Sequence, residues 1–169
     1  IGLDVGYAIR TLDECVELAF NEYEILTPIL DSRCICGISP VYSELVERVE
    51  ARLAKKTVAN KVIDWLVDVN AARQMRFGDS SFLLEPNVKE GKGGLRDFHT
   101  MLWIAHTRYN AHNLTEIETM GLISSREKTD VLKALDFIWD IRKRIDAITG
   151  RKYDRLLFEH QLEIAVDLG

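Results

Sequence analysis

The sequence has few cysteines that could form disulfides, few prolines and glycines that could interrupt helices, and no long apolar segment. Its 169 residues include three cysteines, three prolines and ten glycines. No uncharged apolar stretch approaches the roughly 20 residues that a membrane span needs, so we expect no membrane partner. The glycine and proline counts exclude a collagen-like or low-complexity chain. Because the cysteine count is odd and Cys34 and Cys36 form an isolated CxC, we expect free thiols of a cytoplasmic protein.

The charge balance is acidic, with 22 basic and 27 acidic residues and a net charge of −5. Non-specific binding to DNA depends on neutralising phosphates, so DNA is not an expected partner. The length suits one globular domain, alone or with part of a second. Ile1 opens the sequence without a methionine or a basic leader. We therefore expect no signal peptide and a fragment of a longer protein.

Most patterns that carry catalysis are missing. The sequence has no D-x-D or D-x-E pair, no His-Asp dipeptide, no G-x-S-x-G elbow and no HExxH. His99 and His106 lie seven residues apart, but no carboxylate at helical spacing completes a ligand set. The sequence therefore predicts no catalytic residue, no metal site and no cofactor in this chain.

Apolar periodicity predicts a mainly α-helical bundle with a short N-terminal strand. The strand is expected at Val5–Ile9. The predicted helices start at Leu12, Pro28, Ser39, Val58, Leu95, Thr115, Ser124 or Ser125, and Leu156. The helix that Pro28 opens is expected to end near Gly37. We expect one common core built from Leu135, Ile138, Ile145, Leu102, Leu66 and Val62.

A glycine-rich loop before the predicted helix at Leu95 is the main candidate site. Gly93 and Gly94 give the backbone freedom to turn, and Lys89, Lys92 and Arg96 carry positive charge. A helix N-terminus with unpaired N–H groups favours an anion, so the loop is a candidate phosphate site. The alternative is structural: the glycines make a tight corner, and Arg96 and Asp97 pair with buried backbone or with each other.

A second basic cluster spans Arg142–Arg144 and Gly150–Leu156, and includes Asp154 and Arg155. Cations near a helix C-terminus interact favourably with the helix dipole. The cluster is therefore either an electrostatic cap or a contact between domains. We assign Asp97, Asp154 and Arg155 to such a structural or interdomain role.

Three stretches resemble one family. The run from Leu83 to Ala105, with the motif E-P-N-x-K-x-G-x-G-G-L-R-D at Glu85–Asp97, closely resembles the central helical region of the bifunctional PII uridylyltransferase/uridylyl-removing enzyme family. Asp4–Cys15 resembles the last strand of that family's nucleotidyltransferase domain and the helix after it. Gly150–Gln161 resembles the segment before its HD phosphohydrolase domain. The three stretches follow the family order.

The resemblance implies a domain arrangement and an activity for the longer enzyme. Residues 1–20 would end a nucleotidyltransferase-like domain, and residues 21–169 would form the helical bundle domain. Such an enzyme transfers UMP from UTP to the PII signalling protein and removes it again, with magnesium expected at its catalytic sites. Its partners here would be the flanking nucleotidyltransferase and HD phosphohydrolase domains, PII and UTP.

We therefore expect a non-catalytic module that supports nucleotide binding and domain positioning, with Lys89, Lys92, Gly93, Gly94 and Arg96 as candidate nucleotide contacts. The alternative is a structural or regulatory spacer, or a protein-interaction module, that binds no nucleotide. A stand-alone transferase would need the carboxylates that the sequence lacks.

Overall fold

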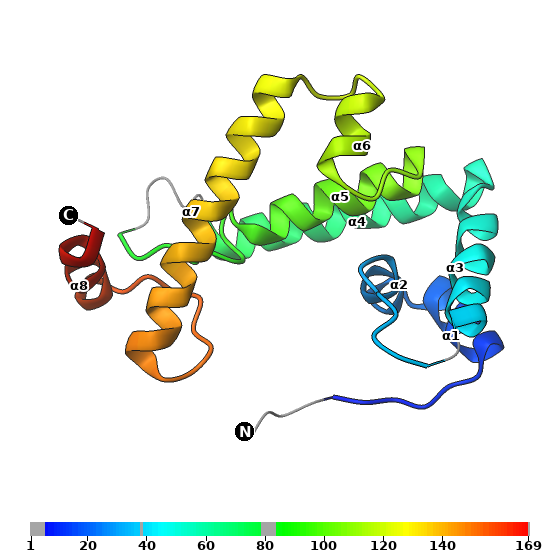
Figure 1. The fold of residues 1–169 in the computed structure, drawn as a ribbon, viewed down its shortest axis with the longest axis horizontal. Helices are drawn as coiled ribbons and strands as arrows, with labels where there is room; N and C mark the ends of the chain where they lie inside the picture. The colour runs from blue at the N-terminus through cyan, green and yellow to red at the C-terminus, as the bar shows by residue number, and fades with distance from the viewer. Residues whose placement is uncertain (1–5, 38, 79–83, 169) are drawn as a thin grey trace. The chain divides into compact units, whose positions relative to one another are not determined.

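The computed structural model describes residues 6–37, 39–78 and 84–168. Helices account for most of these residues, and no strand forms among them (Figure 1). The helices are α1 (Leu12–Asn21), α2 (Tyr23–Leu30), α3 (Ser39–Leu53), α4 (Lys56–Phe77), α5 (Leu95–Tyr109), α6 (Leu114–Thr119), α7 (Ser125–Thr149) and α8 (Phe158–Leu168). The predicted mainly α-helical class is confirmed. Among the described residues, every helix is too short or too polar to cross a lipid bilayer.

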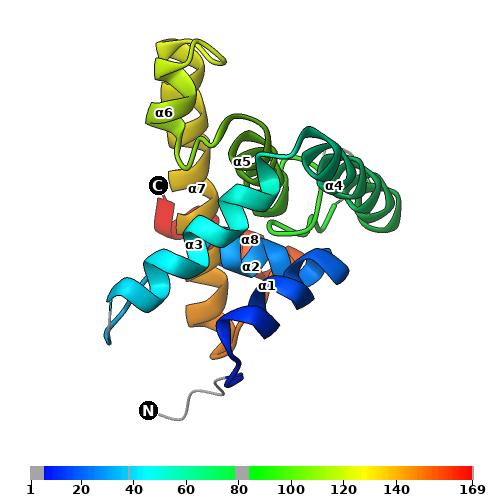
Figure 2. The ribbon, with the colours of Figure 1, turned by 90° about the vertical axis from the view of Figure 1, so that its right-hand side faces the viewer.

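The helices divide into two units, Ile1–Val62 and Ile63–Gly169, and the boundary falls within α4. In the first unit α1 packs against both α2 and α3 (Figure 2). The apolar side chains buried in this unit are Val16, Ala19, Leu26, Val49, Leu53, Ala59 and Val62.

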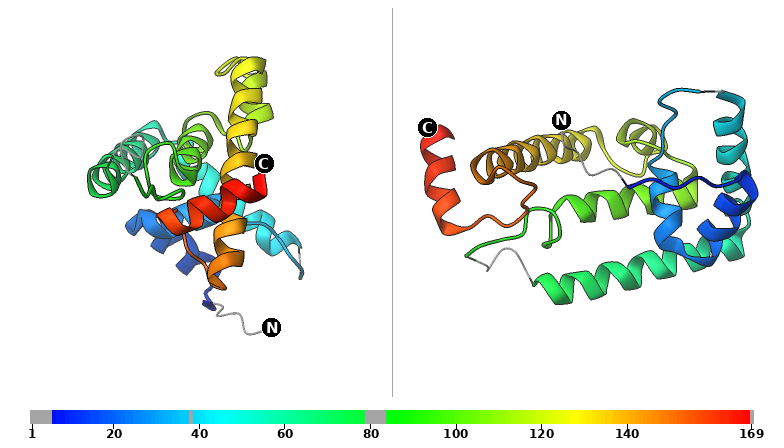
Figure 3. Two further views of the ribbon diagram at one scale, coloured as in Figure 1. Left: turned by 90° about the vertical axis from the view of Figure 1, so that its left-hand side faces the viewer. Right: turned by 90° about the horizontal axis from the view of Figure 1, so that it is seen from below.

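In the second unit α7 is the longest helix and contacts α6 near one end and α8 near the other (Figures 1 and 3). One cluster contains Ala105, Ala111, Leu114 and Ile117, with Leu102 packed against it. A second cluster contains Ile141, Ile145 and Ile164. The prediction of one common core was therefore wrong. A helix of this length extends about 37 Å at 1.5 Å per residue, so its two ends pack against different partners.

Local capping signals place several helix ends where the sequence predicts them. Thr11 caps α1, and the Glu14 carboxylate accepts a hydrogen bond from the Thr11 N–H at 2.7 Å. Ser124 and Glu127 form the same capping box at the start of α7. Gly150 ends α7 with φ +66°, in the left-handed region. The two capping boxes depend on side chains three residues apart and the C-terminal end on a single glycine, so local patterns identify all three.

The expected helix at Pro28 was wrong. Pro28 lies inside α2, which runs from Tyr23 to Leu30, and residues 31–37 are not helical. Proline has no N–H to donate to the carbonyl oxygen four residues earlier, that of Glu24. The Thr27 hydroxyl donates to this oxygen instead, at 3.5 Å. Because Leu26 is fully buried, packing also holds the helix in place.

The expected N-terminal strand was also wrong in the part that the structure describes. Val5 lies outside the described residues. From Gly6 to Ile9 the chain is neither strand nor helix, and Tyr7 and Ile9 are 90% and 96% exposed. A strand needs a neighbour to share its hydrogen bonds, and none of the described segments pairs with this one.

Replacing Ile145 by Ala is expected to lower the free energy of unfolding by about 2–5 kcal/mol, because its side chain is fully buried. Replacing Ile138 by Ala should cost less than about 2 kcal/mol, because Ile138 is only half-buried. Urea denaturation of both variants measures the difference. Equal losses would contradict the assignment of Ile145 to a packed cluster.

Candidate functional site

The glycine-rich loop caps α5 with its own backbone. Four N–H groups at the start of a helix have no partner inside it. Here all four donate to backbone carbonyl oxygens. The Gly94 N–H donates to Gly91 at 2.9 Å and the Leu95 N–H to Val88 at 3.2 Å. The Arg96 N–H donates to Lys89 at 2.9 Å and the Asp97 N–H to Gly94 at 3.1 Å. The loop thus folds back over the end of the helix.

This arrangement corrects one step in the argument for a phosphate site. That argument requires unpaired N–H groups at the N-terminus of α5. Because the loop carbonyls already accept those hydrogen bonds, an anion cannot bind them while the loop keeps this conformation. Any anion contact would depend on the side chains alone.

The glycines are needed at two positions for different reasons. Gly93 has φ +77°, where residues with a side chain are strained. At Gly94 an added Cβ would lie 2.8–2.9 Å from the backbone oxygens of Val88, Lys89 and Gly91. The close approach of these oxygens is what lets them reach the start of α5. The tight corner expected from the sequence is confirmed.

The loop is also joined to the segment after α7. The Asn87 side-chain oxygen accepts hydrogen bonds from the N–H groups of Lys89 and Glu90, at 3.0 and 2.7 Å. Asn87 forms an isolated antiparallel bridge with Arg155. On one side of the bridge the Val88 N–H donates to the Asp154 carbonyl oxygen at 2.8 Å. These bonds hold two segments more than 60 residues apart in fixed register.

Asp97 links the loop to α4. Its carboxylate accepts hydrogen bonds from the Gly93 N–H at 2.7 Å, from Gln74 at 3.3 Å and from the Arg73 guanidinium, with which it also forms an ion pair. Burial alone would raise the pKa of Asp97, but the bonds from Gly93 and Arg73 outweigh it and hold that pKa below its ordinary value. Asp97 is therefore ionised and bound at neutral pH.

A chain of alternating charges runs through the loop to α7. The Arg96 guanidinium lies 3.6 Å from the Glu90 carboxylate, which lies 3.5 Å from the Lys89 ammonium. Lys89 lies 3.7 Å from the Asp154 carboxylate, which accepts a hydrogen bond from the Arg142 guanidinium at 2.7 Å. Networks of this kind stabilise more than isolated surface pairs do. We call these five residues the charge network.

The network shows where the predicted residues lie. Lys89, Arg96 and Asp154 are in it, whereas Lys92 is exposed on the loop. The structural alternative had Arg96 and Asp97 pair with buried backbone or with each other. In the structure Glu90 lies beside Arg96, and Asp97 binds Arg73 and the Gly93 backbone N–H. Sequence reasoning missed the partners Glu90 and Arg73. No local pattern marks an ion pair between residues 24 positions apart, as Arg73 and Asp97 are.

Arg155 lies outside the charge network, at the far side of the bridge with Asn87. Its guanidinium lies 3.3 Å from the Glu85 carboxylate. The pair again joins the loop to the segment after α7. The interdomain role assigned to Arg155 stays a prediction.

A cavity of about 520 Å³ lies beside the loop, between α4 and α5. Its lining includes the aromatic rings of Trp65, Phe77 and Trp103 and the guanidinium groups of Arg76 and Arg96. The Arg96 guanidinium lies 5.6 Å from the centre of the Trp103 ring, in a cation–π contact. Rings and guanidinium groups together can stack on a base and bind a phosphate.

Magnesium is the metal ion that the resemblance implies for the parent enzyme. Magnesium takes oxygen ligands, chiefly carboxylates and water. Within the described ranges, no three carboxylates bring their oxygens close enough to hold one ion. The magnesium expected for the parent enzyme stays a prediction.

Comparison with known proteins matches residues 61–169 to the family described as GlnD PII-uridylyltransferase. A bifunctional uridylyltransferase/uridylyl-removing enzyme of Rhodopseudomonas palustris is 41% identical over all 169 residues. Relatives with the same description from Bradyrhizobium sp. and Phenylobacterium zucineum are each 40% identical over the same length. The chain spans 18% of the length of these curated relatives. No solved structure matches it.

Replacing Gly94 by Ala is expected to destabilise the protein by about 3 kcal/mol or more, because three backbone oxygens would overlap the new Cβ. Replacing Gly93 by Ala should cost only about 1–2 kcal/mol, since its Cβ would meet open space and only the backbone is strained. Gly121→Ala is a matched control with φ +71° and open space. Chemical denaturation that ranks Gly94→Ala level with the other two would contradict the capping role.

Acid should weaken the contribution of Asp97 to stability. A carboxyl group whose pKa is lowered by folding stabilises fully above its unfolded pKa and loses that effect as pH falls through the folded value. The stability lost in Asp97→Asn should therefore be constant from pH 7 to about 5 and shrink below about pH 4. Urea unfolding of both proteins at each pH tests this. A difference that persists unchanged at pH 3 would refute it.

Proposed function

Because the chain belongs to the GlnD PII-uridylyltransferase family, we propose that it is a non-catalytic helical module that positions the catalytic parts of such an enzyme. The family membership confirms the resemblance drawn from the motif at Glu85–Asp97. The curated relatives are described as bifunctional uridylyltransferase/uridylyl-removing enzymes. On this proposal the partners of the module are the nucleotidyltransferase and HD phosphohydrolase domains that flank it, with PII and UTP as substrates.

The observation that carries the proposal is that ion pairs join the loop to both α4 and α7. The loop binds α4 through Asp97 and Arg73, and it binds α7 through Lys89, Asp154 and Arg142. Its charged groups are occupied in holding helices in register. A module that sets the relative position of two domains needs such internal rigidity, because a loose connection would not transmit a fixed geometry.

A second role, support of nucleotide binding, is favoured by the cavity beside the loop. Arg76 and Arg96 could contact phosphate oxygens there, and the rings of Trp65 and Trp103 could stack on a base. UTP is the nucleotide that family membership suggests. Lys92 is close in sequence and exposed, so it remains a candidate phosphate contact.

Kinetics of a longer enzyme that contains this chain separate the two roles. If the module only positions domains, Arg142→Ala should lower kcat and leave the KM for UTP within about twofold. The Lys89→Ala/Lys92→Ala double variant should likewise leave that KM unchanged. If the two lysines contact the phosphates of a nucleotide bound beside the loop, the double variant should raise the KM for UTP by about tenfold or more.

Lys133→Ala is the matched control, since Lys133 is exposed on α7. The melting temperature of each variant, measured by circular dichroism, distinguishes a kinetic effect from unfolding. A full kcat for Arg142→Ala together with a raised KM for the double variant would overturn positioning as the main role.

A further inference from the structure

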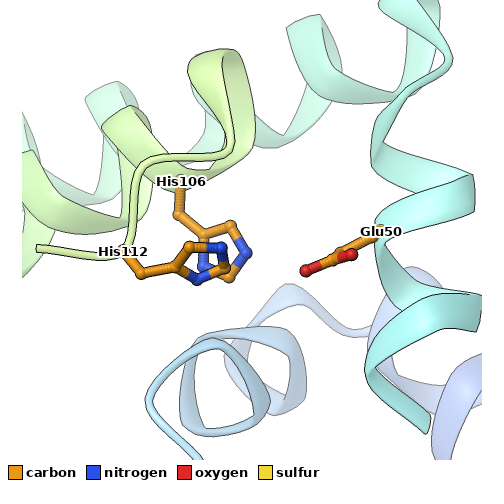
Figure 4. Close-up of side chains that lie close together, drawn as sticks. All are labelled: Glu50, His106 and His112. Carbon is orange, nitrogen blue, oxygen red and sulfur yellow. The ribbon is translucent and has the colours of Figure 1, made fainter. Parts of the chain in front are cut away.

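Two histidines face each other beside the C-terminal end of α5. His106 is in the last turn of α5, and His112 lies in the short segment before α6. Their ring centres are 4.2 Å apart and the ring planes are tilted by 58° (Figure 4). One ring nitrogen of each lies within 4.8 Å of the other. Six residues of chain thus bring two potential ligand atoms together.

The backbone fixes this approach. Asn110 has φ +53° and turns the chain back over the helix end. Ala111 is then fully buried, and its N–H donates to the Ala105 carbonyl oxygen at 3.4 Å. The His112 N–H donates to the Glu116 carboxylate at 2.7 Å, which anchors the segment to the first turn of α6. The position of the second histidine is therefore set by folding.

The His106 ring has an unused ligand atom. Its Nε2 is buried and has no hydrogen-bond partner. Burying a polar atom without a hydrogen-bond partner is unfavourable, so such atoms are uncommon in folded proteins. A metal ion binds the lone pair of a neutral ring nitrogen. The buried Nε2 of His106 offers such an atom, and no hydrogen bond occupies it.

We propose that His106 and His112 bind a late first-row divalent metal ion, Ni²⁺, Cu²⁺ or Zn²⁺, through one ring nitrogen each. Imidazole suits these ions, whereas Mg²⁺ and Ca²⁺ require oxygen ligands. The Glu116 carboxylate brings negative charge to the same place, and water fills the other coordination positions. This site is separate from the glycine-rich loop and does not depend on the proposed positioning role.

The geometry needs only a small adjustment. Two nitrogens that bind one ion at about 2.1 Å must lie within about 4.2 Å of each other. His112 is exposed, so its ring can rotate toward His106 without disturbing a packed core. Binding would join the end of α5 to the start of α6. It should therefore also raise the melting temperature of the chain.

The test is a Ni²⁺ titration of the tag-free 169-residue chain. Cys34 and Cys36 are exposed thiols that bind metals themselves, so the titration uses a Cys34→Ser/Cys36→Ser background. We expect one equivalent to bind, with the NMR signals of His106, Ala111 and His112 broadened first by the paramagnetic ion. Calorimetry gives the affinity.

Two variants decide the assignment. His112→Gln keeps the fold, because its side chain is exposed, and should weaken Ni²⁺ binding by at least about tenfold, or 1.4 kcal/mol. His99→Gln is the matched control, since His99 lies on α5 outside the pair, and it should bind as the parent does. Unchanged affinity in His112→Gln, equal losses in both variants, or no binding by the parent at millimolar Ni²⁺ would each overturn the proposal.

Discussion

The second unit depends on the hydrogen bonds that the glycine-rich loop makes with the start of α5. All four accepting carbonyl groups belong to the loop itself, so no side chain is needed as a cap. This arrangement requires glycine at position 94, because a Cβ there would overlap the backbone oxygens of Val88, Lys89 and Gly91. Once the loop has this shape, the Gly93 N–H faces the Asp97 carboxylate, and that carboxylate is placed to bind Arg73 on α4. One backbone motif thus sets the partners of several charged groups.

The same constraint bears on what the loop can bind. Sequence alone presents Lys89, Lys92 and Arg96 as three cations beside a helix N-terminus, which is the usual description of an anion site. In the structure the helix end is filled by carbonyl oxygens, and Lys89 and Arg96 lie beside Glu90. A phosphate there would have to compete with carboxylates already in place. Ligand binding beside the loop therefore fits the aromatic cavity better than the loop backbone, and the loop itself fits a structural task.

How far the sequence predicts this protein depends on the range of the interaction. Capping boxes at Thr11 and Ser124 act over three residues, so both helix starts were predicted correctly. The prediction that Pro28 begins a helix was wrong because the Thr27 hydroxyl replaces the missing backbone donor inside α2. Helix propensities do not include such a substitution. The glycine-rich corner was predicted, since glycine reports a backbone requirement directly. Its ionic partners were not predicted, because Arg73 and Asp97 lie 24 residues apart on different helices and no local pattern links them.

The two ends of α5 differ in whether their polar groups have hydrogen-bond partners. At the N-terminal end every first-turn N–H has a carbonyl partner, and the nearby carboxylates and cations are joined to one another. At the C-terminal end Asn110 turns the chain, and the His106 Nε2 is left buried without a partner. Polar groups that are already satisfied gain little from a ligand, whereas an unsatisfied buried nitrogen gains the interaction that folding did not supply. New binding chemistry in this unit is therefore expected at the histidine pair, at the end of α5 opposite the glycine-rich loop.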